Sequence, residues 1–498
     1  MIAPIQRLPI EILIAIFSLY RYKNVPLELL WVCRWWRRIA LATPHLWSKF
    51  RLCTWTTVAK VAFILDRTVT SPLNVEISTD ADTPISHTPT SPPYAALLLA
   101  ATEAKRWRRL SIRSYPPEDH MNSNEYLKKL PSALNGQLEG LRVLKMNVWY
   151  RHPVSLLFIT PFLHNKITSL ILDSPATLDY IIQPQFVAIF HALVICKISH
   201  CTEDIMIDIL TQFRRLETLD LAFLNLPSYP VETDLQLVRT LKYMKIEGAS
   251  VQWMAGRKFP NLKECLIIDP LHPEMISPRR CVDLPVCTNF TYDAHSIDTI
   301  TNFCIPTLDV LTIRPNPDVR GSELAALWSA APGKAALHKP RVLHLRTGCR
   351  DKDLIEVLSK LPGLEEFHLC LLCGWEQDGL GTMFFTSLQA EERKGWNTQA
   401  ATHECRLCPN LTTLSICYDW LCFPGKPDIV TPKLNELVES RWKTSIVLQN
   451  VKFWHSVVAR GDNPITVGDP GAYGSPIIVG DPGAYGSPTR YTSAPGQG

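Results

Sequence analysis

The sequence predicts a mixed α/β protein: an N-terminal module of three helices, an irregular solenoid with parallel strands inside and helices outside, and a disordered C-terminal tail. Three observations support this fold class. Residues 8–47 place apolar side chains at helical spacing, a six-residue apolar pattern recurs eleven times, and the C-terminal residues contain VGDPGAYGSP twice. We expect the following domains: 1–50, helical module; 51–105, linker; 106–455, solenoid; 456–498, tail.

The N-terminal module is predicted from proline positions and apolar spacing. Pro9 suits the first turn of a helix, because a missing N–H costs nothing there. Pro26 marks a second short helix by the same reasoning, and Thr43-Pro44 ends a third. The apolar residues of the first and third helices are Leu8, Ile12, Leu13, Ile16 and Phe17, then Val32, Trp35, Trp36, Ile39 and Ala40. So short a chain cannot bury them all against each other, so the surplus needs the rest of the chain or another protein.

The linker is predicted to alternate between helix and strand. We expect a helix over Thr54 to Asp66, a strand over Pro72 to Ser78 and a helix over Tyr94 to Trp107. Thr79 to Pro93 is rich in Pro, Thr and Ser, which favours an exposed loop.

The pattern L-x-x-L-x-I, with conservative substitutes, organises the solenoid. Its fourth positions are Leu110, Leu144, Leu170, Cys196, Leu219, Met244, Cys265, Leu311, Leu343, Phe367 and Leu414. Most intervals lie at or near the roughly 20–29 residues of leucine-rich repeats, which the pattern resembles. Helical stretches are expected between strands, for example at 203–213, 322–331 and 353–361. Two longer intervals contain 269–298, expected to be an irregular insertion, and 373–405, expected to be a surface loop with a short helix.

Composition excludes several functions. A net charge of +4 on 498 residues gives no basis for nucleic-acid binding, and no apolar run is long enough to cross a membrane. The fifteen cysteines are scattered among apolar segments and no export signal precedes them, which favours a reducing cytoplasmic or nuclear setting. No phosphate-binding loop, zinc-protease motif or nucleophile elbow occurs, so we expect neither an enzyme nor a cofactor.

Two C-x-x-C pairs form the strongest metal candidate. Cys370, Cys373, Cys405 and Cys408 could supply four thiolates to zinc. Against this, Cys370 lies in or beside a predicted strand, and the sequence after Cys408 leads into a repeat strand. We therefore expect core thiols and no metal, and keep a zinc module as an alternative.

The third and fifth positions of each repeat are expected to point to the concave side of the solenoid. Lysines recur there on alternate strands, which suggests a surface for an acidic or phosphorylated segment of a protein substrate. The candidate substrate-binding residues are Arg109, Lys145, Lys197, Tyr243 and Lys245. The alternative is a solvated charged face without a specific pocket.

The N-terminal segments "LP-x-EIL-x-x-IF", "VC-RWW-RRIA" and "TP-x-LW" together resemble the F-box, especially its fungal form. The resemblance implies docking onto the adaptor subunit of an SCF-type (Skp–cullin–F-box) ubiquitin ligase, and through it onto a cullin, while the repeats recognise a protein substrate. It implies adaptor contacts by Leu8, Pro9, Ile12, Leu13, Ile16, Phe17, Val32 and Trp35, whereas Ile39, Leu46 and Trp47 hold the helices together. The alternative is an interaction scaffold that delivers no substrate.

Overall fold

The computed structural model describes most of the regular elements of the chain. The described residues are 8–20, 27–53, 55–79, 92–114, 130, 133–134, 137–148, 162, 166–173, 191–199, 212–222, 236–248, 254–268, 281–294, 298–315, 321–328, 337–347, 350–371, 382–393, 402–405, 407–419, 433–434, 436–437, 440–441, 448, 450–456 and 477–478. They fall into two compact units, Met1–Asp283 and Leu284–Gly498. The boundary lies inside the range predicted as one solenoid, and the predicted domain limits stay predictions.

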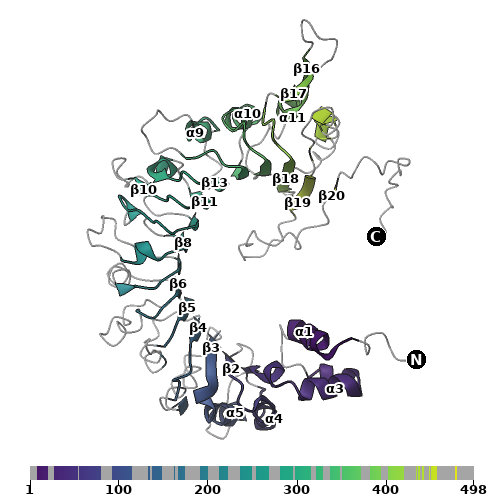
Figure 1. Ribbon diagram of the computed structural model, residues 1–498, viewed down its shortest axis with the longest axis vertical. Helices are drawn as coiled ribbons and strands as arrows, with labels where there is room; N and C mark the ends of the chain where they lie inside the picture. The colour runs from purple at the N-terminus through teal and green to yellow at the C-terminus, as the bar shows by residue number, and fades with distance from the viewer. Residues whose placement is uncertain are drawn as a thin grey trace, which may run out of the picture. The chain divides into compact units, whose positions relative to one another are not determined.

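Unit 1 begins with short helices. They are α1 (Ile10–Tyr20), α2 (Leu29–Val32), α3 (Arg34–Leu41) and the 3-10 helix η2 (Pro44–Trp47). An extended residue, Cys33, separates α2 from α3, and its sulfur accepts a hydrogen bond from Trp36 N, which caps α3. Figure 1 shows α1 and α3 close together, and α3 packs against both α1 and η2. Ile39, Leu46 and Trp47 are buried, as expected.

The linker supplies the first two strands of a sheet. Its elements are β1 (Lys49–Leu52), α4 (Val58–Thr68), β2 (Leu73–Thr79), α5 (Pro92–Ala101) and η3 (Ala104–Arg106). Helix α4 starts later than expected because Thr57 is its N-cap and accepts a hydrogen bond from Lys60 N. Helix α5 ends early because β3 already begins at Trp107. The predicted strand at 72–78 is confirmed by β2, whereas the predicted loop lies mostly outside the described residues.

A parallel sheet forms the rest of unit 1. Its strands are β3 (Trp107–Ser114), β4 (Val143–Val148), β5 (Ser169–Asp173), β6 (Ile195–Ser199), β7 (Thr218–Ala222), β8 (Tyr243–Glu247) and β9 (Glu264–Ile268). From β1 to β9 each strand pairs in parallel with the next strand of the chain (Figure 1). Two smaller elements of the unit are η7 (Gln236–Arg239) and β10 (Val282–Asp283).

The register puts equivalent repeat positions side by side. Leu110, Leu144, Leu170 and Cys196 are lateral neighbours, and each is at most 2% exposed. These fourth positions form the buried ladder of the unit, because alternate residues of a strand point to opposite faces. The third and fifth positions line the other face of the sheet, called the open face below. The predicted repeat is therefore confirmed as a parallel-strand ladder.

Unit 2 repeats the arrangement. Strands β11 (Asn289–Ala294), β13 (Val310–Pro315), β14 (Val342–Thr347), β15 (Glu366–Leu371), β18 (Thr413–Asp419) and β19 (Asn450–Ser456) pair in parallel in that order. A short antiparallel strand, β20 (Ile477–Ile478), pairs with β19. Helices α9 (Gly321–Ala326), α10 (Asp351–Ser359) and α11 (Thr382–Leu388) pack in sequence. The helices expected at 322–331 and 353–361 are confirmed in part by α9 and α10, while most of 203–213 lies outside the described residues.

The two long intervals have different causes. The first interval contains one more repeat, because β11 pairs with β13 and aligns Phe290 with Leu311. The prediction of an irregular insertion over 269–298 was therefore wrong for residues 289–294. The second is a true insertion, since β15 pairs directly with β18. It contains α11 and an antiparallel hairpin of β16 (Ala390–Arg393) and β17 (Thr402–Cys405). The small elements η10 (Asp298–Asn302) and β12 (Phe303–Cys304) belong to unit 2.

Among the described residues, no helix is long and apolar enough to cross a membrane. The predicted disordered tail lies outside the described residues except for Ser456, Ile477 and Ile478.

Candidate interaction surfaces

The N-terminal helices have a small core of their own. Leu13 and Phe17 are fully buried, and the Phe17 ring lies 4.9 Å from the ring of Trp36 on α3. Trp47 donates its indole N–H to Ala40 O at 2.8 Å and meets Phe63 of α4 edge-on at 5.4 Å. Trp47 therefore joins the helical module to the linker that begins the sheet.

Several large apolar side chains are exposed on α1, on α2 and just before α1. Relative exposure is 48% for Ile12, 77% for Leu19 and 86% for Trp31. Among the described residues this set, called the exposed apolar face below, is Leu8, Ile10, Ile12, Ile16, Leu19, Trp31 and Val32. Soluble proteins seldom leave contiguous large apolar side chains in water, and such patches mark interaction surfaces.

The residues implied by the F-box resemblance divide into three groups. Leu8, Pro9, Ile12, Ile16 and Val32 are exposed. Trp35 is half-buried, and Arg38 lies 4.9 Å above its ring. Leu13 and Phe17 are buried in the module and support the exposed residues from behind.

Sequence reasoning missed Ile10, Leu19 and Trp31, which belong to the exposed apolar face. Ile12, Ile16 and Leu19 have helical spacing, so that pattern could have identified Leu19. Arg34, Arg37 and Arg38 are exposed on α3 and add positive charge beside the tryptophans. Aromatic and arginine side chains are the residue types that contribute most to protein–protein binding.

The lysines predicted to bind substrate on β6 and β8 are paired with carboxylates. Lys197 Nζ lies 3.0 Å from Asp220 Oδ2, and Lys245 Nζ lies 2.7 Å from Glu247 Oε2 and 3.9 Å from Asp220 Oδ1. Burial alone lowers the pKa of Lys245, but its hydrogen bond to Glu247 and the nearby carboxylates outweigh burial and raise it. Burial and the charge of Asp220 raise the pKa of Tyr243. This part of the open face is a neutralised network.

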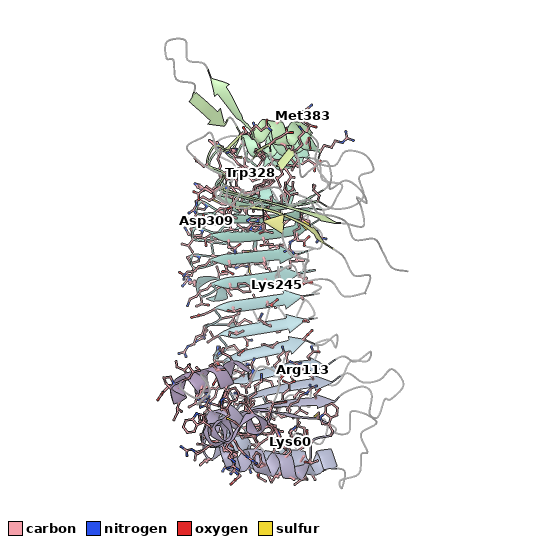
Figure 2. The ribbon with its side chains drawn as sticks, turned by 90° about the vertical axis from the view of Figure 1, so that its right-hand side faces the viewer. Lys60, Arg113, Lys245, Asp309, Trp328 and Met383 are labelled. Atoms are coloured by element: carbon pink, nitrogen blue, oxygen red, sulfur yellow. The ribbon has the colours of Figure 1, made fainter. Side chains whose placement is uncertain are left out.

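Arg109 and Lys145 differ from the β6–β8 residues. Arg109 is exposed on β3 and Lys145 is half-buried on β4, and neither forms an ion pair with any residue that the structure describes. Arg113 shares the carboxylate of Glu76 with Arg51, with a closest N–O distance of 3.6 Å for each arginine. Figure 2 shows Arg113 and Lys245 on separate strands of the ladder.

The corresponding face of unit 2 carries a histidine pair. The rings of His344 on β14 and His368 on β15 stack with centroids 4.2 Å apart and planes 5° apart. Burial, the neighbouring His368 and Arg314 lower the pKa of His344 to about 4. Glu366 Oε2 lies 3.5 Å from His368 Nε2. His344 is therefore neutral at pH 7.

The zinc alternative gains no support from the described cysteines. The buried Cys408 thiol lies 3.6 Å from Leu358 O and 3.5 Å from Leu361 O, and burial raises its pKa to about 12. Cys370 is half-buried on β15, and Cys373 lies outside the described residues. No cluster of three potential metal ligands occurs among the described side chains. Cys408 is thus a protonated structural thiol.

Comparison with models of known protein families and with curated protein sequences finds no match to this chain.

Proposed function

We propose that the chain is a substrate receptor of an SCF-type ubiquitin ligase. In this proposal the N-terminal helices act as an F-box that binds the adaptor subunit, and the adaptor connects the chain to a cullin. The repeat sheet binds a protein target. This chain brings target and ligase together without performing transfer chemistry, so its contribution is a high effective concentration.

The exposed apolar face carries the proposal. Ile12 and Ile16 remain 48% and 39% exposed, although Leu13 and Phe17 on the same helix are fully buried. Helix α1 is thus apolar on both sides, and the described residues of the chain cover only one of them. Because Ile12 and Ile16 are already about half buried, a partner that covered the rest would gain roughly 1–1.5 kcal/mol for each of them. This arrangement matches the surplus of apolar residues that the sequence predicts for the N-terminal module.

The decisive experiment is co-purification of tagged full-length protein with the adaptor and the cullin. The test variant is Ile12→Ser/Ile16→Ser, which shortens two exposed side chains on α1. Isoleucine and serine have similar helix propensities, so the helix itself should persist. Losing two apolar contacts of this size should weaken adaptor binding about a hundredfold.

A matched control is Val58→Ser/Leu98→Ser. Both residues lie on helices of the same unit, α4 and α5, and each is 41% exposed. The control should retain the adaptor, and both double variants should keep the thermal unfolding midpoint of wild type. Failure of wild type to retain an adaptor, or equal retention by test and control variants, would refute the assignment.

Retention of the cullin distinguishes a substrate receptor from a scaffold without a delivery role. A receptor retains the cullin together with the adaptor, and its bound target accumulates when the adaptor is depleted. A scaffold shows neither behaviour. The structure offers no observation that favours the scaffold over the receptor.

A further inference from the structure

We propose that Arg109, Arg113 and Lys145 form a binding site for one phosphoryl or carboxylate group on an extended acidic peptide segment. These three residues are called the cationic patch below. The proposal refines the proposed function, because it locates the target-binding site and gives the chemistry of its ligand. It places the anion-binding site on β3 and β4 and not at the lysines of β6 and β8.

The strand register places the three side chains around one point. Ser111 on β3 is the lateral neighbour of Lys145 on β4, and Arg109 and Arg113 are the residues two before and two after Ser111. All four therefore lie on the open face. Adjacent strands are about 4.8 Å apart and residues rise about 3.3 Å each, so the two arginines are about 13 Å apart along β3 with Lys145 beside their midpoint.

The side chains offer suitable donors. The side chain of Arg113 is 41% exposed and Arg109 is exposed, so both guanidinium groups can reach a ligand in solution. Guanidinium groups bind phosphate and carboxylate oxygens through paired hydrogen bonds, and an ammonium group adds a point charge. Ser111 forms no side-chain hydrogen bond with any described residue, and the register places it between Lys145 on β4 and Glu76 on β2.

The charge balance distinguishes this patch from the rest of the face. On the open face of β3 and β4 the side chains are Arg109, Ser111, Arg113, Val143, Lys145 and Asn147, which include no carboxylate. On β6 to β8, Asp220 and Glu247 neutralise the two lysines. An anion at β3–β4 meets Arg109 and Lys145, which form no ion pair with any described residue, and Arg113, which shares Glu76 of β2 with Arg51. An anion at β6–β8 must instead displace the ion pairs of both lysines.

Acidic side chains limit the size of the ligand. Glu76 lies on β2, on one side of the patch, and Asp173 lies on β5, on the other, where it accepts a hydrogen bond from Asn147. A long polyanion such as a nucleic acid would run over these carboxylates. A peptide with one localised anion avoids them, and its remaining residues can extend over the neutral positions.

The test measures peptide binding to the full-length protein by fluorescence anisotropy. Three fluorescein-labelled Gly/Ala peptides differ at one central residue, which is phosphoserine, glutamate or serine. A single-stranded oligonucleotide is the fourth probe. The test variant is Arg109→Gln/Lys145→Gln, and the matched control is Lys197→Gln/Lys245→Gln, which removes the same charge from the same face.

We expect wild type to bind the phosphoserine peptide at least tenfold more tightly than the serine peptide. The test variant should lose at least tenfold of this affinity, while the control changes less than threefold. If the glutamate peptide binds as tightly as the phosphoserine peptide, a carboxylate is sufficient for binding at the cationic patch. Absence of anion preference, equal losses in the two variants, or tighter binding of the oligonucleotide would overturn the proposal. Adaptor co-purification is unaffected by these variants, so the two proposals fail independently.

Discussion

Replacing His344 by glutamine should change how the stability of the protein depends on pH. His344 stacks on His368. Burial, the neighbouring His368 and the charge of Arg314 lower the pKa of His344 to about 4, from an ordinary value of 6.5. Glutamine keeps a polar side chain at this position but cannot take up a proton in this range.

The magnitude follows from proton linkage. The difference between 6.5 and about 4 corresponds to roughly 3 kcal/mol, and partial exposure reduces this to about 2 kcal/mol. The unfolded chain protonates His344 more readily than the folded chain does. The stabilisation from this histidine is therefore complete above pH 6.5, and is lost as the pH falls through the interval from about 6.5 to about 4.

Urea unfolding at pH 7.5 and pH 4.5 measures this effect. Wild type should lose about 2 kcal/mol more of its unfolding free energy between these pH values than His344→Gln loses. Titrating groups that do not interact with His344 cancel in the comparison. His338→Gln serves as the control, because His338 is exposed. If wild type and His344→Gln lose the same free energy, the argument from the stacked pair is refuted.

Three further substitutions test the packing. Arg441→Leu should destabilise unit 2 by about 3–5 kcal/mol in urea unfolding, because this buried guanidinium donates to the carbonyls of Leu388, Leu407 and Cys408 at 2.8, 2.8 and 3.1 Å. Gly140→Ala should lower the thermal midpoint, since a Cβ would lie 2.5 Å from Lys105 O; an unchanged midpoint would contradict this contact. Cys408 should resist alkylation by iodoacetamide until the protein unfolds, because its thiol is buried with a pKa of about 12; mass spectrometry of the native protein would reveal early modification.

The strand ladder could be predicted because its signal is local. Leu219 and Leu221 alternate with polar residues within five positions, and this alternation alone defines a strand and its buried side. Strand β11 escaped prediction because its buried residues are Phe290 and Tyr292 in a segment without leucine. The repeat pattern is mainly aliphatic, whereas the core at this repeat is filled by aromatic rings, including Phe303 at 5.2 Å from Phe290.

The charge state of the open face could not be predicted because it depends on register. Lys197 and Asp220 are 23 residues apart in the sequence, and only the alignment of β6 with β7 makes them lateral neighbours. A one-residue shift would turn Asp220 to the buried side and leave Lys197 unpaired. The lysines therefore suggested a continuous cationic surface, while the structure confines the unneutralised residues Arg109 and Lys145 to β3 and β4.

The exposed apolar face and the core beneath it explain each other. Phe17 and Trp36 pack at 4.9 Å, and Trp47 fixes the end of α3 through Ala40 O and reaches Phe63 of the linker. These contacts hold α1 and α3 in place without using Ile12, Ile16 or Trp31. A pre-organised surface loses little conformational entropy on binding, so its apolar area contributes more fully to affinity. Mutations of the exposed residues should therefore affect partner binding and leave folding intact, whereas mutation of Phe17 or Trp47 should affect both.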